Sequence, residues 1–329
     1  MFKAVVMNQT EDRQPILTIE NLDDSFLSAE GEVTVRVRYA GLNYKDGLCL
    51  NGQGGLIREF PRIPGVEFAG EVLESRDERY AVGEQVIATG SRIGEIWHGG
   101  YAEKASVKAD WLVPLPKGMD MRQSMIFGTA GITAVYGLQA LERHGLTPDK
   151  GEVLVTGAAG GVGSFAIALL SALGYSVAAV TGRVDESGDY LRSLGADTLV
   201  PRQELAEVIK RPLESERWAG CIDNVGGEML ARILGQLKYG CSVAAIGNAG
   251  GPQMPASVIP FLLRGVNLLG IDSVNQPYDS RVQAWLRLVD DFPLDKLDRI
   301  ATEITLDDLE TAGRDILSGK IQGRFFVCL

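Results

Sequence analysis

The segment from Val153 to Gly163 constrains the fold of this chain more than any other. It reads VLVTGAAGGVG, and an apolar, helix-like run continues from Phe165 to Leu173. β-branched residues favour a strand, glycines permit a tight turn, and the N-terminus of a helix presents backbone N–H groups to an anion. The segment therefore predicts a strand, a pyrophosphate-binding turn and a helix. A turn without a ligand is the alternative. The candidate contacts are Gly157, Ala159, Gly160, Gly161, Val162 and Gly163.

The composition is typical of a globular protein large enough for two domains. The chain has 329 residues, of which 45% are hydrophobic and 23% charged. No apolar run approaches the length of a membrane span, and the N-terminus lacks the apolar core of a signal peptide, so we expect a cytoplasmic protein without a membrane partner. The net charge of −11 disfavours nucleic acid as a partner, because that binding depends on basic surfaces.

Four cysteines are spread along the chain without paired spacing. This distribution argues against a disulfide framework and against a zinc lobe. We expect thiols that are buried in the core or incidental. They are Cys49, Cys221, Cys241 and Cys328.

Two kinds of pattern follow one another along the chain. The first hundred or so residues contain β-branched runs such as 33–39, with alternating polar residues and frequent glycine and proline, which predicts a curved, barrel-like β domain. From about Ser124 a helical pattern over 127–140 leads into alternating strands and helices, which predicts a doubly wound parallel sheet with its ligand at the carboxyl ends of the strands. The expected parallel strands are 153–157, 176–181, 221–225, 242–247 and 267–271, with a further strand-like segment at 198–201.

The parallel pattern stops after Asp272. Helical patterns at 281–291 and 306–318 precede an apolar segment, Arg324 to Cys328. A terminal strand with no parallel partner left in the nucleotide-binding domain would return to the first, β-rich domain. We therefore expect two domains that pack against each other with a cleft between them.

The residues after the second parallel strand favour NADPH over NADH. An NAD site has an acidic residue there, about twenty positions after the glycines, whereas this chain has Thr181, Gly182 and Arg183. A hydroxyl and a planar cation suit a 2′-phosphate. Arg202 offers a second cation or is a solvated surface arginine. The acidic pair 185–186 fits better as the first turn of the next helix.

Four motifs together resemble a known family. They are GLNYKD at 41–46, PGVEFAG at 64–70, the glycine turn at 157–163, and GIDSV at 270–274. The chain resembles the zinc-independent medium-chain dehydrogenase/reductases, and within them the NADPH-dependent acryloyl-CoA reductase branch, whose members are also described as quinone oxidoreductases. The resemblance implies an α/β protein with a GroES-like catalytic domain from 1–124 and 272–329, a Rossmann domain over 125–271, and a homodimer.

Zinc-containing relatives have Gly-His-Glu where this chain has Gly65, Val66 and Glu67. Only His98 and His144 occur in the sequence, too few suitable ligands for a catalytic zinc. Without a metal to polarise an alcohol or aldehyde oxygen, an acceptor that is already electron-poor is favoured. We expect hydride transfer from NADPH to the β carbon of an activated C=C bond, first of all reduction of acryloyl-CoA, a short-chain unsaturated acyl-CoA, to propionyl-CoA. The alternatives are a broad enone or quinone reductase and a non-catalytic NADPH-binding protein.

The resemblance also suggests the catalytic residues. Tyr44 is the candidate polar group beside the nicotinamide, with Asn43 and Asp46 orienting its loop; its phenol can donate to an enolate oxygen or transfer a proton. Alternatively, Tyr44 only packs against the cofactor and water supplies the proton. Further candidate cofactor contacts are Ile246, Gly247, Ser273 and Arg324, of which Arg324 either meets a phosphate of NADPH or CoA or is a packing arginine.

Overall fold

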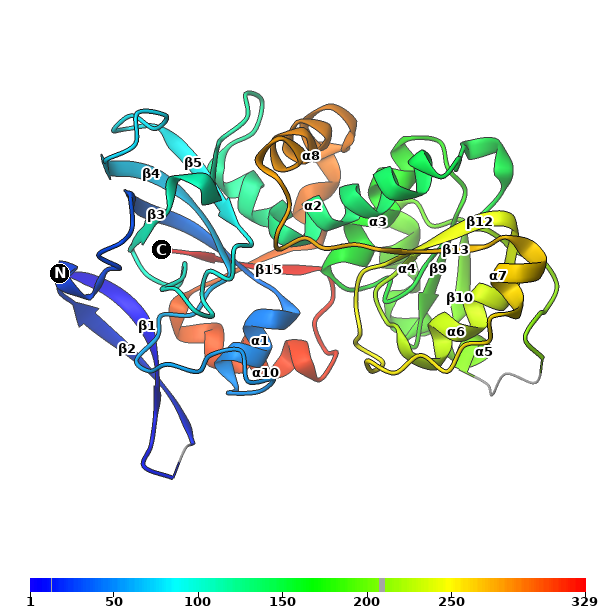
Figure 1. Cartoon of the computed structure of the whole chain (residues 1–329), viewed down its shortest axis with the longest axis horizontal. Helices are drawn as coiled ribbons and strands as arrows, with labels where there is room; N and C mark the ends of the chain where they lie inside the picture. The colour runs from blue at the N-terminus through cyan, green and yellow to red at the C-terminus, as the bar shows by residue number, and fades with distance from the viewer. Residues whose placement is uncertain (13, 207–210) are drawn as a thin grey trace. The chain divides into compact units, whose positions relative to one another are not determined.

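The computed structural model describes residues 1–12, 14–206 and 211–329. It divides into two compact units, coloured along the chain in Figure 1. The N-terminal unit comprises Met1–Thr129, Ser273–Val289 and Leu297–Leu329, and the central unit comprises Ala130–Asp272 and Asp290–Lys296.

The sequence pattern places the domain boundaries at 124/125 and 271/272, and the observed division differs from it mainly at 290–296. Two contacts hold this segment in the central unit. The ring of Phe292 packs edge-on against Phe165, with 5.7 Å between centroids. The Lys296 Nζ donates a hydrogen bond of 2.7 Å to the carbonyl oxygen of Leu194.

The N-terminal unit contains a two-stranded hairpin and a seven-stranded, mainly antiparallel sheet. In the larger sheet the strand order is β14-β15-β3-β4-β5-β7, and β6 pairs with β3. Val33, Val35 and Val37 are buried while Arg36 and Arg38 are exposed, so β3 has the predicted period of two. The strands are β1 (Phe2–Gln9), β2 (Pro15–Leu22), β3 (Val33–Leu42), β4 (Glu67–Ser75), β5 (Gln85–Thr89), β6 (Lys104–Val107), β7 (Leu112–Pro114), β14 (Ala301–Ile304) and β15 (Arg324–Cys328).

The last strand returns to the first unit, as expected. β15 pairs antiparallel with β3, and Phe325 lies opposite Leu42. Nearby, α1 (Tyr44–Leu50) packs on α10 (Leu309–Leu317). This packing is close, because a Cβ on Gly47 would stand 2.5 Å from a methyl carbon of Ile316. The two ends of the chain therefore fix the position of α1 together.

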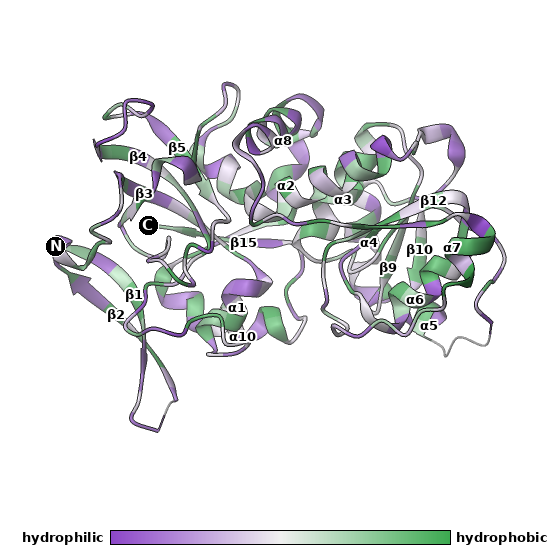
Figure 2. Cartoon of the chain, viewed as in Figure 1, coloured by the Kyte–Doolittle hydropathy of each residue, from purple (hydrophilic) through white to green (hydrophobic). Residues whose placement is uncertain are grey.

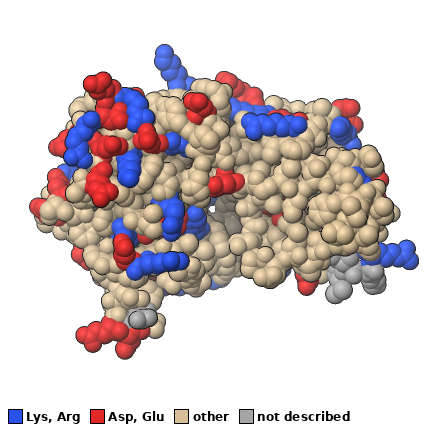
Figure 3. Space-filling model, viewed as in Figure 1, with Lys and Arg blue, Asp and Glu red and all other residues tan. Residues whose placement is uncertain are grey.

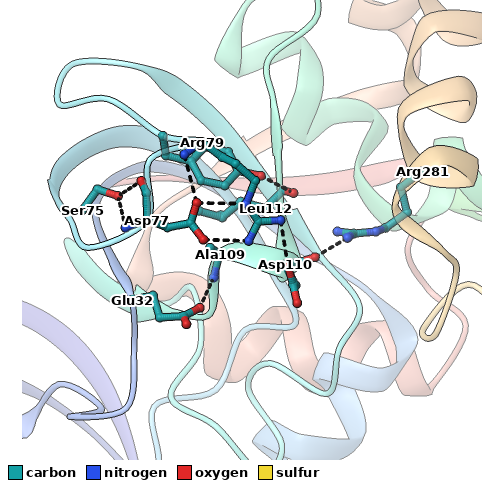
Figure 4. Close-up of polar contacts among 9 residues, drawn as sticks. Glu32, Ser75, Asp77, Arg79, Ala109, Asp110, Leu112 and Arg281 are labelled. Atoms are coloured by element: carbon teal, nitrogen blue, oxygen red, sulfur yellow. Dashed lines mark hydrogen bonds and ion pairs between the residues drawn. The ribbon is translucent and has the colours of Figure 1, made fainter.

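Helix α8 (Tyr278–Asp291) is anchored by a buried arginine, shown in Figure 4. Arg281 donates to the carbonyl oxygen of Trp111 at 2.7 Å and also to that of Asp110. The Asp110 carboxylate pairs in turn with Arg79, at 2.8 Å, and Arg79 also pairs with Asp77. α8 is thus tied through the turn at 109–111 to the loop after β4.

The central unit is a six-stranded parallel sheet with the order β10-β9-β8-β11-β12-β13. The chain runs outward from β8 in one direction and from β11 in the other, so the carboxyl ends of β8 and β11 form the topological switch point where such sheets bind ligands. The predicted doubly wound sheet is confirmed. The strands are β8 (Val153–Val155), β9 (Val177–Thr181), β10 (Thr198–Pro201), β11 (Trp218–Asp223), β12 (Leu237–Ala245) and β13 (Asn267–Gly270).

Most of the remaining helices begin the central unit or connect its strands, whereas α9 (Leu297–Ile300) leads into β14 of the N-terminal unit. They are α2 (Met121–Arg143), α3 (Gly161–Ala172), α4 (Val184–Leu194), α5 (Arg202–Ala206), α6 (Gly227–Gln236), α7 (Ile259–Arg264) and α9 (Leu297–Ile300). Short 3₁₀ turns occur at Asp24–Phe26, Ala109–Trp111, Pro148–Lys150, Leu294–Lys296 and Leu306–Asp308.

One expectation about apolar runs was wrong. Helix α2 is, by length and composition, long and apolar enough to cross a membrane, although most of its apolar stretch is buried inside the protein. Gly128 interrupts it with a non-helical conformation, φ 47° and ψ −152°. Burial and interruption are typical of a core helix in a folded domain.

Charged side chains are interspersed on the surface. On the face drawn in Figure 3, Lys and Arg of the N-terminal unit alternate with Asp and Glu, while much of the drawn face of the central unit carries few charges.

Candidate functional site

The glycine turn joins β8 to α3 in the central unit. Gly157 has φ +56°, a conformation that favours glycine, and the Gly160 N–H donates to the Gly157 carbonyl oxygen at 3.0 Å. Gly160 is the N-cap and α3 begins at Gly161. A Cβ on Gly163 would stand 2.7 Å from the Ala158 Cα, so the first turn of α3 lies directly on the loop.

This arrangement fits a pyrophosphate. The first four N–H groups of a helix have no acceptor within the helix, and the helix dipole favours an anion beside them. Here the glycines keep side chains out of the turn, while Ala158 and Ala159 are buried beneath it. The residues present can therefore hold the diphosphate of a dinucleotide.

Polar side chains lock the carboxyl ends of β8 and β11 together. Thr156 Oγ1 donates to the Asp223 carboxylate at 2.7 Å, and Asn224 donates to Thr156 from its backbone N–H and its side-chain amide, at 2.9 and 2.7 Å. Asp223 also accepts the Gly226 N–H at 2.8 Å, and burial raises the pKa of its carboxyl. These residues were not predicted; their only signal in the sequence is a polar side chain at or directly after the end of each of two neighbouring strands.

Ile246 and Gly247 lie at the same edge of the sheet. Their N–H groups both donate to the carbonyl oxygen of Asp223, at 2.8 and 3.2 Å. A Cβ on Gly247 would stand 2.9 Å from the Asn224 carbonyl carbon. The structure thus brings these two predicted cofactor contacts onto the switch point, next to the end of β11.

The predicted 2′-phosphate residues gather at the end of β9. Thr181 Oγ1 accepts the Arg183 N–H at 3.1 Å, which turns the chain at Gly182. The guanidinium of Arg202 lies against Gly182, because a Cβ there would stand 3.0 Å from both Cζ and Nε of Arg202. Arg183 is half-buried, and its Nε is 3.9 Å from Glu186. Two cations from different elements therefore flank Gly182.

The acidic pair after this turn occupies the first turn of α4, as the sequence predicts. Asp185 and Glu186 lie near the N-terminus of α4, where the helix dipole favours acids. The two positions between β9 and α4, where an NAD site has an acidic residue, are Gly182 and Arg183. The donors at this turn therefore suit a phosphate.

Tyr44 is the first residue of α1 in the N-terminal unit. Asn43 is the N-cap, and the Asp46 carboxylate accepts the Asn43 N–H at 2.8 Å and the Val66 N–H at 2.9 Å. Asp46 is fully buried; burial first, and then the neighbouring Glu67, raises the pKa of its carboxyl to about 6. The Tyr44 side chain, by contrast, is 42% exposed. The predicted loop residues therefore surround the start of the helix that carries the phenol.

The structure corrects the phosphate role given to Arg324. Its guanidinium is 2% exposed and forms an ion pair with Glu67, which is fully buried. It also donates to the carbonyl oxygen of Leu42 at 2.6 Å and to the side-chain oxygen of Asn43 at 2.8 Å. Enclosed in this way, Arg324 cannot reach a phosphate of NADPH or CoA, and the packing alternative holds.

A second charged cluster lies next to Tyr44 and was not predicted. Lys45 and Arg92 both pair with Glu95, at 3.1 and 3.3 Å, and Glu95 is buried. Arg92 belongs to a turn in which Ser91 and Arg92 have φ of 52° and 56°, conformations that cost energy for non-glycine residues. The Ser91 N–H donates to the Val274 carbonyl oxygen at 3.0 Å.

Ser273 directly precedes Val274, where the chain re-enters the N-terminal unit. Its side chain is half-buried. The hydrogen bond from Ser91 to Val274 holds this segment on the turn that carries Arg92. A contact between Ser273 and the cofactor remains a prediction.

The histidines and cysteines do not form a metal cluster in the ranges that the structure describes. His98 packs on Phe26, and its Nδ1 accepts the Ile63 N–H at 3.2 Å. Burial lowers the pKa of His98 to about 4. Of the cysteines, Cys49 and Cys221 are buried, Cys241 is half-buried and Cys328 is exposed.

Known proteins match this chain over nearly its whole length. The alcohol dehydrogenase GroES-like domain matches residues 29–117, and the zinc-binding dehydrogenase family matches residues 161–291. The acrylyl-CoA reductase AcuI of Ruegeria pomeroyi is 58% identical over 99% of both chains. The crystal structure of Escherichia coli K-12 YhdH with bound NADPH has a TM-score of 0.96 at 49% identity, covering 99% of both chains. That of Bacillus subtilis YhfP with NAD bound has a TM-score of 0.95 at 43% identity, covering 100% of this chain and 99% of the other.

Proposed function

The chain belongs to the zinc-independent medium-chain dehydrogenase/reductases, in the acrylyl-CoA reductase branch, and we propose that it reduces acryloyl-CoA to propionyl-CoA with NADPH. The observation that carries the proposal is the 58% identity to an acrylyl-CoA reductase over 99% of both chains. A broad enone or quinone reductase is the second candidate, and the identity of 43% to the YhfP branch supports keeping it.

The cofactor site fits NADPH. When bound, this cofactor supplies a hydride. The amides and glycines from Gly157 to Gly163 bind its pyrophosphate, and Thr181, Arg183 and Arg202 bind its 2′-phosphate. A relative was crystallised with NAD, so the choice between the two cofactors depends on these side chains. The two guanidinium groups beside Gly182 favour the phosphorylated form.

The N-terminal unit, which carries Tyr44, orients the substrate and stabilises charge. In an α,β-unsaturated thioester, hydride addition at the β carbon develops negative charge on the carbonyl oxygen, and the α carbon then takes a proton. We assign Tyr44 to this step: its phenol donates a hydrogen bond to the oxygen or delivers the proton. If Tyr44 only packs against the cofactor, water delivers the proton. Val66 stands where zinc relatives have a histidine, so the residues around Tyr44 do not provide the metal alternative.

A CoA ester carries phosphates that need cations. Lys45 follows Tyr44 directly and pairs with one oxygen of the buried Glu95, and Arg92 pairs with the other. Both cations remain partly exposed, at 34% and 46% of the side chain. With one carboxylate between them, they leave one net positive charge beside Tyr44. We assign this pair to the phosphate-bearing part of the substrate.

A homodimer in the cytoplasm is the proposed assembly. In the central unit α7 exposes Leu262 and Leu263, by 73% and 63%, and Figure 2 shows much of this helix as hydrophobic. Within the described part of the chain, β13 pairs only with β12, so its other edge offers unpaired backbone groups. A second copy related by a two-fold axis would cover both features.

The test is NADPH oxidation, followed at 340 nm, with acryloyl-CoA and with a simple quinone. The proposal expects turnover of acryloyl-CoA and formation of propionyl-CoA. Turnover of the quinone alone would support the second candidate instead. The third reading, a non-catalytic NADPH-binding protein, would require that every activated alkene and quinone be inert although NADPH binds.

A further inference from the structure

We infer that the buried ion pair between Glu67 and Arg324 positions the phenol of Tyr44, acting through the side chain of Asn43. The inference rests on the role proposed above for Tyr44. It concerns two residues from distant parts of the chain, at the start of β4 and the start of β15, neither of which can touch a substrate because both are buried.

Asn43 is held at both ends of its amide. Its side-chain nitrogen donates to Glu67 Oε1 at 2.8 Å, and its side-chain oxygen accepts from Arg324 Nη1 at 2.8 Å. The same nitrogen donates to Asp46 at 3.1 Å. A carboxylate accepts and a guanidinium donates, so the pair determines both the rotamer of Asn43 and which way its amide faces.

The surrounding backbone is built to accommodate the pair. A Cβ on Gly41 would stand 2.8 Å from the Glu67 carboxyl carbon, and a Cβ on Gly128 would stand 2.5 Å from both Glu67 Oε1 and Arg324 Nη2. Gly128 is the non-helical residue of α2, and Glu67 accepts the N–H of Thr129, where the helix resumes. Two glycines thus leave room for the pair, and a carboxylate caps the restarted helix.

Stability alone does not account for such an arrangement. Removing two charges from water has a large cost in free energy, and an apolar pair of similar volume is often as stable or more so. A buried pair does, however, impose one geometry, since its hydrogen bonds are directional. The geometry imposed here is that of Asn43, the N-cap of α1.

The N-cap in turn fixes the position of Tyr44. Tyr44 is the residue after Asn43 and the first of α1, so its Cα–Cβ direction follows from the conformation of the cap. Among the described residues, no hydrogen-bond partner of the Tyr44 hydroxyl is found, and Tyr44 is 42% exposed. The backbone at Asn43 therefore sets the direction in which the phenol leaves the chain.

The test is a double-mutant cycle between Asn43→Ser and Tyr44→Phe. Serine is a good N-cap but is too short to bridge Glu67 and Arg324, so N43S leaves the ion pair and the helix cap in place while cutting the link. We expect N43S to lower kcat for acryloyl-CoA about tenfold when Tyr44 is present, and less than about twofold in the Y44F background. The same fractional loss in both backgrounds would overturn the inference.

A second readout is independent of turnover. Hydrogen exchange of the free protein should accelerate in N43S at the amides of 44–50, with the rest of the chain unchanged; unchanged exchange there would also overturn the inference. Arg314→Gln is the matched control, because Arg314 pairs with Glu310 on the exposed face of α10.

If Tyr44→Phe alone leaves kcat unaltered, the proposed role of Tyr44 fails, and the exchange experiment then decides whether the pair positions α1. If acryloyl-CoA is inert but a quinone reacts, the cycle is run on the quinone.

Discussion

The guanidinium group of Arg202 lies flat enough on Gly182 that a Cβ at that glycine would stand 3.0 Å from its Cζ and 3.1 Å from its Nη2. Gly182 directly follows β9 and Arg202 begins α5, so their contact brings a cation from a second element onto the turn that precedes Arg183. A planar cation is thereby placed over the turn that, in an NAD site, holds an acidic residue.

The first prediction is that Arg202→Gln lowers the preference for NADPH. Loss of a charge-assisted contact to the 2′-phosphate should raise KM for NADPH about tenfold or more, while KM for NADH changes little because NADH has no phosphate there. Arg183→Gln should act in the same direction. KM values for both cofactors, measured at constant salt with saturating acceptor, check the prediction.

Arg192→Gln is the control for charge alone. Arg192 is exposed in the last turn of α4, away from the loop at Gly182. Its replacement removes one positive charge from the same unit and should leave both KM values unchanged. If R202Q and R192Q raise KM for NADPH equally, long-range charge explains the effect and Arg202 does not bind the phosphate.

The second prediction concerns the phenol. Tyr44→Phe keeps the ring and removes the hydroxyl, so kcat should fall about tenfold or more while the Kd of NADPH, measured by its fluorescence, stays similar. A loss of NADPH affinity with unchanged kcat would instead assign Tyr44 to cofactor packing, the alternative reading.

The architecture could be predicted from local patterns because each strand of the central sheet carries its own signal. The apolar run at 153–155, the glycines after it and the strand–helix alternation were sufficient for the order of elements, and the sheet has the expected doubly wound form. The C-terminal strand was found for a similar reason: 324–328 has no parallel partner left in the central sheet, and it pairs in the N-terminal unit, antiparallel with β3 and parallel with β14.

The buried cluster around Arg324 could not be predicted in the same way. Glu67 and Arg324 are 257 residues apart in the chain, and the sequence around Arg324 does not indicate that the Glu67 carboxylate pairs with it. An arginine near a C-terminal strand is equally compatible with a phosphate contact, and only burial decides between the two. Asp223 and Thr156 were missed for another reason, since each is a single polar residue at the end of an apolar strand.

The third prediction concerns assembly. Leu262→Lys together with Leu263→Lys places two charges on the apolar face of α7, which should convert a dimer to a monomer in sedimentation velocity. Tyr239→Lys is the matched control, because Tyr239 is an exposed aromatic residue on β12 of the same unit. If the wild-type protein sediments as a monomer, or if the double variant remains a dimer, α7 is not the interface.

The last prediction concerns the pH dependence of stability. Burial and the nearby Glu67 raise the pKa of Asp46 in the folded protein to about 6, above its ordinary value of 3.8. The folded state therefore binds a proton more tightly than the unfolded state, so the contribution of Asp46 to stability is fully present below pH 3.8 and is lost as pH rises through 6.

Asp46→Asn removes this dependence. Its amide offers one acceptor to the N–H groups of Asn43 and Val66, which lowers stability, but the loss does not vary with protonation. The free energy of unfolding of the wild type minus that of D46N, from urea titrations at pH 4.5, 5.5 and 7, should therefore decrease as pH rises. Contributions of other groups, including His98, whose pKa is lowered to about 4 and whose effect has the opposite sign, cancel in this difference.

Asp189→Asn, at an exposed position in α4, is the matched control and should give a constant difference. A constant difference for D46N as well would mean that Asp46 ionises in the folded protein as it does in the unfolded chain.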